Sequence, residues 1–185
     1  MRTFCSSTML CAFAAAALAS GAPSANAARA PRLKVKLTTS YGQDAGTATF
    51  TQRKNGVHVK IDAKNLPFGD HAMHIHEYPV CDAPDFHGAG NHFNPDGKKH
   101  GIRNPAGHHN GDLPVNLEIG EDHMGSASFN VDHLSLDPNA PDSLFLNGGT
   151  SIVIHKRPDD MMTDPTGNAG NRIACGIITQ AGLQK

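Results

Sequence analysis

The sequence predicts an all-β protein, a sandwich or barrel of about eight short antiparallel strands. Three observations support this fold class. Several segments alternate apolar and polar residues with a period of two, Gly- and Pro-rich turns separate them, and no long amphipathic helical pattern follows residue 27. The 185 residues, 38% of them hydrophobic, suit a single domain with a modest core.

The first 27 residues have the pattern of a secretory signal peptide. Arg2 gives a positive start, residues 9–18 are apolar, and Ala25-Asn26-Ala27 supplies small residues for a cleavage point. The apolar run is too short to span a bilayer, so we expect no membrane span. We therefore expect residues 28–185 to form one exported domain.

Removal of this leader would leave two cysteines, Cys81 and Cys175. An even pair in an exported protein predicts a disulfide, because oxidising compartments favour the bond. The bond would close a loop of roughly a hundred residues, for which loop entropy gives about 4–5 kcal/mol of stabilisation.

The strands are expected in the following order. Residues 33–38, LKVKLT, and 57–62, VHVKID, alternate so that one face of each is buried. Residues 45–54 fit as their partner, with Asn55-Gly56 as a tight hairpin turn before the second of them. Later strands are expected at residues 114–119, 124–131, 150–155 and 173–179.

Two stretches do not fit strands, residues 78–113 and 156–171. Both are rich in glycine, proline and polar residues. Loops of this length are uncommon in a compact domain unless they are functional or disordered. Their composition and position indicate function.

The charge balance does not indicate binding to nucleic acid or to an acidic membrane, whereas the histidine content indicates metal binding. Sixteen basic residues against 17 acidic ones give a net charge of −1, which predicts neither nucleic acid nor an acidic membrane as partner. Twelve histidines are the unusual feature, and most lie between residues 71 and 133.

The segment HAMHIHE, residues 71–77, contains His74 and His76, which share one face if the segment is a strand. This pair alone is a weak signal for a metal. The next candidates follow at spacings of 8, 9 and 3 residues: His92, His100, His109 and Asp112. Imidazoles with one carboxylate suit zinc, and imidazoles alone suit copper as well. Spacing alone leaves open a nonspecific histidine-rich metal binder.

The segments GDHAMHIHE, GNHFNPDGKKHG, GHHNGDLP and TGNAGNRIACGII resemble the signature segments of the copper/zinc superoxide dismutases. The resemblance runs from about residue 32 to 180. It implies a Greek-key, immunoglobulin-like β-sandwich or barrel with two long functional loops. Departures from the family's eukaryotic pattern, such as the longer segment between Cys81 and His92, together with the leader imply a bacterial, exported member, periplasmic or secreted.

The resemblance also implies the site residues. Copper would be held by His74, His76, His92 and His155. Zinc would be held by His92, His100, His109 and Asp112, with His92 bridging the two ions through both ring nitrogens. His108 is the rival of His109, which lies three residues before Asp112 as in the family. Asp159 would join a copper histidine to a zinc histidine, Arg172 would orient the anion beside copper, and Cys81 and Cys175 would pair.

The implied reaction is the disproportionation of superoxide to oxygen and hydrogen peroxide by copper cycling between +2 and +1, with Arg172 and His92 as the catalytic residues. Oligomeric state stays open, since the family contains homodimers and monomers.

Two alternative functions remain. An exported copper- and zinc-binding module without turnover would need the same ligands but not Arg172. A zinc hydrolase would leave one zinc position to water, and the fourth ligand Asp112 argues against it. We expect His71 to pack near the site. The histidines outside the proposed ligand set are expected to face solvent: His58, His87, His108, His123 and His133.

Overall fold

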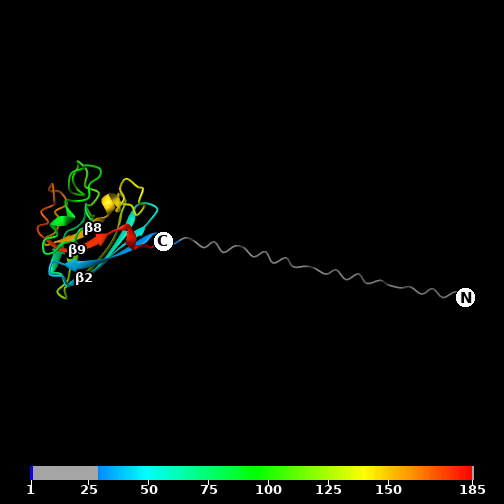
Figure 1. Ribbon diagram of the computed structural model, residues 1–185, viewed down its shortest axis with the longest axis horizontal. Helices are drawn as coiled ribbons and strands as arrows, with labels where there is room; N and C mark the ends of the chain where they lie inside the picture. The colour runs from blue at the N-terminus through cyan, green and yellow to red at the C-terminus, as the bar shows by residue number, and fades with distance from the viewer. Residues whose placement is uncertain (2–28, 185) are drawn as a thin grey trace.

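The computed structural model describes residue 1 and residues 29–184, so the expected signal peptide lies outside the described part of the chain. Figure 1 shows strands that form a curled sheet, with long loops gathered at the end away from β10 and the C-terminus. Every strand pairing is antiparallel. The predicted all-β class is confirmed.

The strands are β1 (Arg32–Thr39), β2 (Asp44–Gln52), β3 (Val57–Lys64), β4 (Gly69–His71), β5 (Met73–His76), β6 (Leu117–Ile119), β7 (Met124–Val131), β8 (Thr150–His155), β9 (Arg172–Ile178) and β10 (Leu183–Gln184). Three short 3-10 turns are the only helical elements within residues 29–184: η1 (His87–Ala89), η2 (Leu146–Gly148) and η3 (Gln180–Gly182). Among the described residues, no helix is long and apolar enough to cross a bilayer.

The main sheet has the order β5-β8-β9-β1-β2-β3-β7, with β10 beside β1, while β4 and β6 form a separate pair. Strands β1 to β3 are joined by hairpins, and β9 returns over a long connection to lie beside β1. This order is that of a Greek key. It brings β5 and β8, far apart in sequence, together at one edge.

The alternating segments bury the residues that the sequence predicts. Leu33, Val35 and Leu37 of β1 are buried, while the intervening lysines are exposed. The hairpin turn spans residues 53–56, and the Arg53 amide donates to the Gly56 carbonyl at 2.9 Å. Gly56 has φ +85°, and a Cβ there would overlap the Val131 carbonyl of β7. Only glycine therefore fits this turn.

A second, smaller apolar cluster lies apart from the main core. Phe86 and Ala89, from the long loop after β5, pack with Val153 of β8 and Cys175 of β9. Cys81 joins this cluster through the predicted disulfide to Cys175, which is present. The cluster and the disulfide together fix this loop against β8 and β9.

Some element boundaries differ from the prediction. The strand expected at residues 114–119 is confined to β6, because its partner β4 has three residues and pairs only with Leu117 to Ile119. Strands β4 and β10 were not expected. They contain three and two residues, too few to show an alternating pattern.

Candidate metal centre

Strand β5 supplies the first two histidines of the centre. His74 and His76 are both buried, and their rings lie 6.4 Å apart. β5 pairs with β8, and the His155 amide at the end of β8 donates to the Ala72 carbonyl at 2.9 Å. This pairing places His155 beside the two histidines of β5.

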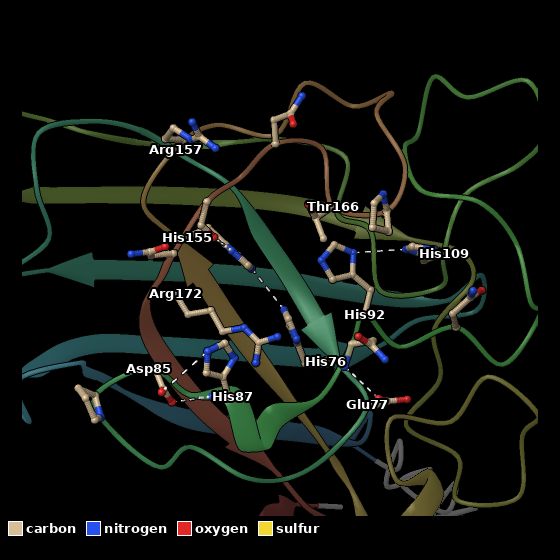
Figure 2. Close-up of a pocket in the computed structure, with 17 residues that line it drawn as sticks. His76, Glu77, Asp85, His87, His92, His109, His155, Arg157, Thr166 and Arg172 are labelled. Carbon is tan, nitrogen blue, oxygen red and sulfur yellow. Dashed lines mark hydrogen bonds and ion pairs between the residues drawn. The ribbon is translucent and has the colours of Figure 1, made fainter.

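His92, from the loop after β5, completes a four-histidine group, and its backbone forms a β-bridge with His76. Ligand-type nitrogens of His74, His76, His92 and His155 all lie within 4.8 Å of one another. Figure 2 shows His76 and His155 turned toward each other, and their Nε2 atoms are 3.3 Å apart. Nδ1 of His74 and Nε2 of His92 are buried without a hydrogen-bond partner. Unpaired buried nitrogens are costly, and a bound cation would satisfy them.

A second group forms around Asp112. Its Oδ1 lies 3.0 Å from His92 Nδ1, 2.9 Å from His100 Nδ1 and 3.3 Å from His109 Nδ1. The Nδ1 atoms of His92 and His109 are 3.3 Å apart. Tetrahedral ligands about 2.0 Å from a zinc ion lie about 3.3 Å from one another, so these separations fit a closed zinc site.

His74 also lies within 4.8 Å of His92, His100 and Asp112. It does not belong to the second group, because its Nε2 is paired with Asp159 and its Nδ1 belongs to the four-histidine group. His109 therefore completes the second group.

The ring of His92 belongs to both groups. Its Nδ1 faces Asp112, while its Nε2 carries no hydrogen bond and lies in the four-histidine group. One imidazole thus presents a different nitrogen to each group. The arrangement can hold two metal ions, one on each side of this ring.

Asp159 accepts hydrogen bonds from one histidine of each group. Its Oδ2 accepts a hydrogen bond from His74 Nε2 at 2.8 Å, and its Oδ1 accepts from His100 Nε2 at 3.0 Å and from the Met161 amide at 2.7 Å. A carboxylate only accepts, so each ring carries a proton on Nε2, and its Nδ1 is the nitrogen that can bind a metal once it is deprotonated. Such partners fix the orientation of metal-binding histidines.

Backbone carbonyls do the same for the other two histidines. His76 Nδ1 donates to the Gly90 carbonyl and His155 Nδ1 donates to the Gly170 carbonyl, each at 3.0 Å. The Nε2 atom of each ring therefore keeps its lone pair, and the two Nε2 atoms face each other. No sequence pattern predicts these carbonyls, because any residue can supply one.

Burial and charge shift the pKa values of these histidines in opposite directions. Burial, helped by the neighbouring His74, lowers the pKa of His92 to about 3. Burial also lowers the pKa of His76 well below its usual value, with repulsion from His92 as the next cause. Burial opposes charge on His100 too, but the carboxylates of Asp112 and Asp159 outweigh it and raise the pKa of His100 to about 9.

The four-histidine group opens into a cavity of about 910 Å³ that is lined by His76, His92 and His155 together with two cations, Arg157 and Arg172. Figure 2 shows Arg172 beside His76. The guanidinium is half-buried, and its Nη1 and Nη2 donate to the carbonyls of Phe86 and Gly90. The loop that the disulfide holds in place therefore also positions this cation.

Lys156 does not line this cavity, whereas Asp85 and His87 do. The sequence had not singled out Asp85 or His87 for the site. Their place in the long segment between Cys81 and His92 was the one available signal.

The six histidines outside the two groups follow the expectation only in part: His87 and His123 are exposed, whereas His58 is half-buried. His71 is buried as expected, with its ring nitrogens 2.8 Å from the His155 and Pro67 carbonyls. His108 and His133 were expected to face solvent, but both are half-buried against each other, because the loop carrying His108 folds onto the segment after β7.

Comparison with known proteins agrees with this geometry. The family model for copper/zinc superoxide dismutase matches residues 44–178. A Cu-Zn superoxide dismutase of Aquifex aeolicus is 45% identical over 145 residues, which cover 77% of this chain and 84% of that protein. The crystal structure of a SOD-like protein from Bacillus subtilis is similar with a TM-score of 0.75 at 36% identity, covering 78% of this chain and 97% of that one. The Cu/Zn superoxide dismutase of Brucella abortus gives a TM-score of 0.65 at 27% identity, covering 80% and 99%.

Proposed function

The chain belongs to the copper/zinc superoxide dismutase family, a family of oxidoreductases, and from this premise we propose how its residues perform the reaction. The proposed reaction joins two superoxide anions and two protons to give one oxygen molecule and one hydrogen peroxide. Copper cycling between +2 and +1, supported by zinc, supplies the electron transfer when both metals are bound. The observation that carries the proposal is the single His92 ring shared by the two groups.

In this proposal, the four-histidine group is the copper site. The donors are Nδ1 of His74 and Nε2 of His76, His92 and His155. Each of the other ring nitrogens of His74, His76 and His155 is held by an acceptor. Fixed neutral imidazoles suit an ion that must keep its ligands in two oxidation states.

The group around Asp112 is the proposed zinc site. The donors are Nδ1 of His92, His100 and His109 with Oδ1 of Asp112. Gly101 and His109 amides donate to the other carboxylate oxygen at 2.8 and 3.0 Å, which holds the carboxylate in place. The closed four-ligand set supports a structural role and disfavours a zinc hydrolase.

His92 is proposed to move a proton as well as to join the sites. Its Nε2 would bind copper in one half of the cycle and, released from the metal, would hold a proton in the other half, and that proton would pass to the peroxide product. The atom is buried and has no competing hydrogen bond, so no other acceptor holds that proton. A general acid so close to the reacting oxygen spares a proton transfer from bulk water.

Arg172 is proposed to attract and orient the superoxide anion. Two of its nitrogens are anchored on carbonyls, which leaves other guanidinium N–H groups for a small anion in the cavity. The chain is net negative, so attraction must be local. Arg157 lines the same cavity and adds to the positive potential there.

The test compares superoxide loss by the purified chain, loaded with copper and zinc, with loss by a His155→Ala variant. A His58→Ala variant, altered on β3 outside both groups, is the matched control. We expect rapid loss with the parent and the control, and a strong decrease with His155→Ala. Equal rates for all three would reject the catalytic assignment, and metal binding without superoxide loss would favour the binding-module alternative.

We also propose that residues 1–27 are removed as a signal peptide and that the mature domain begins at Ala28 in an oxidising compartment. The Cys81–Cys175 disulfide supports export. Intact mass of the protein from its natural location should equal residues 28–185 less two hydrogens. A mass that includes the leader would contradict this proposal.

A further inference from the structure

Two histidines outside the metal centre form a second cluster, which we call the outer histidine pair: His108 and His133. His108 belongs to the loop before Asp112, and His133 follows β7. Their ring centroids are 4.4 Å apart, and the rings are tilted by 58°. Neither residue belongs to the two groups described above.

Hydrogen bonds fix the tautomer of both rings. Nδ1 of His108 lies 2.9 Å from the His109 carbonyl, and Nδ1 of His133 lies 2.9 Å from Asp132 Oδ1. Both partners can only accept, so each Nδ1 carries the proton and each Nε2 keeps its lone pair. Nε2 of His133 is buried and has no hydrogen-bond partner. The pair therefore offers two lone pairs that no described protein group uses.

The fold holds the two rings together. The buried side chain of Asn110 donates to the His133 carbonyl at 3.4 Å and to Asp96 Oδ2 at 3.3 Å, which ties the loop carrying His108 to the segment carrying His133. The Asp132 carboxylate accepts a hydrogen bond from Nδ1 of His133. Metal-binding histidines commonly donate their second ring nitrogen to a carboxylate in this way. The pair is thus positioned by its surroundings and is not a chance contact of two mobile side chains.

We propose that the outer histidine pair is an additional binding site for a divalent first-row cation, with copper(II) preferred. Neutral imidazole is a ligand for copper, nickel and zinc, and affinity rises toward copper in this series. His108 and His133 supply two Nε2 donors, and water completes the shell. The site shares no ligand with the four-histidine group or with the group around Asp112.

The test uses the full chain loaded with one copper and one zinc ion, so that the two main sites are filled and no excess copper occupies the outer histidine pair. Nickel(II), which is redox-silent here, is then titrated by calorimetry, and the histidine resonances are followed by NMR. We expect one further nickel ion per chain and selective broadening of the His108 and His133 ring signals.

Variants separate this site from the main centre. His133→Ala and His108→Ala are each expected to weaken the further nickel binding at least about tenfold, the usual size of losing a ligand or its partner. His58→Ala should leave it unchanged. His74→Ala should impair the four-histidine group and still bind the further ion, so the failure of one site is distinguishable from the failure of the other.

Three outcomes would overturn the inference: no further nickel ion in the parent chain, broadening at other histidines, or unchanged binding in His133→Ala and His108→Ala. The broadening measurement uses the parent chain alone. It therefore decides the question even if either variant fails to fold.

Discussion

Gly167 is the position at which one added methyl group tests the metal centre most directly. It lies in the loop between β8 and β9 with φ +60°, and a Cβ there would overlap Asp159 Oδ1 and lie 2.6 Å from His100 Nε2. Neither side chain can move aside freely, because hydrogen bonds hold both of them. In Gly167→Ala the Asp159 carboxylate must therefore move off its histidines.

Two contributions to the effect can be separated. The positive φ costs about 1 kcal/mol for any residue with a Cβ. Displacing Asp159 removes the partners of His74 and His100, and loss of such partners weakens metal binding about 10–100-fold, or about 1.4–2.7 kcal/mol. The first contribution lowers stability alone, whereas the second lowers metal affinity as well as stability.

Gly97→Ala is the matched control, because Gly97 has φ +62° and a Cβ there would meet nothing within 4 Å. Thermal unfolding of the metal-free proteins should show the cost of backbone strain in both variants and a larger loss in Gly167→Ala, because Asp159 there also loses its hydrogen bonds. Competition with a chelator should show weakened zinc and copper binding in Gly167→Ala only. Parent-like metal affinity in Gly167→Ala, or equal weakening in Gly97→Ala, would refute the role given to Asp159.

Three further predictions follow from the same geometry. Arg172→Gln should decrease the second-order rate of superoxide loss at low ionic strength at least about tenfold with unchanged metal content; an unchanged rate would remove Arg172 from substrate capture. Replacing Cys81 and Cys175 with serine should lower the free energy of unfolding by up to about 4–5 kcal/mol, measured in guanidinium, and an unshifted midpoint would contradict the predicted contribution. In the metal-free protein the pKa of His100 is raised to about 9, so the stability from its proton is present below about pH 6.5 and is lost as pH rises through 9. Zinc must displace that proton, so zinc affinity should increase between pH 6.5 and 9, and a flat profile from chelator competition would contradict this.

Local sequence patterns predicted much of the fold. The alternation in residues 33–38 and 57–62 predicted which side chains of β1 and β3 are buried, because side-chain direction on a strand has a fixed period. The pattern could not find β4 or β10, which are too short to alternate. It also overextended β6, because the length of a strand depends on its partner, and β4 pairs with three residues only.

The site was predicted in part from spacing and in larger part from the family resemblance. Residue types and spacing indicated His74, His76 and the run from His92 to Asp112. The carbonyls of Gly90 and Gly170 could not be predicted, because a backbone acceptor has no residue-type signature. The contact of His108 with His133 was missed for a related reason, since the two residues are joined only by the packing of two loops.

The sequence by itself determined the period of the strands, the chemical types of the ligands and the cysteine pair, because each depends on residue identity or on near neighbours in the chain. Only the tertiary structure decided that His155 meets His76, and that one ring of His92 faces both Asp112 and the four-histidine group. The physical reason is the Greek-key pairing of β5 with β8, together with a loop fixed by Cys81 and Cys175. These features bring distant residues within a few ångströms, and no local pattern encodes that distance.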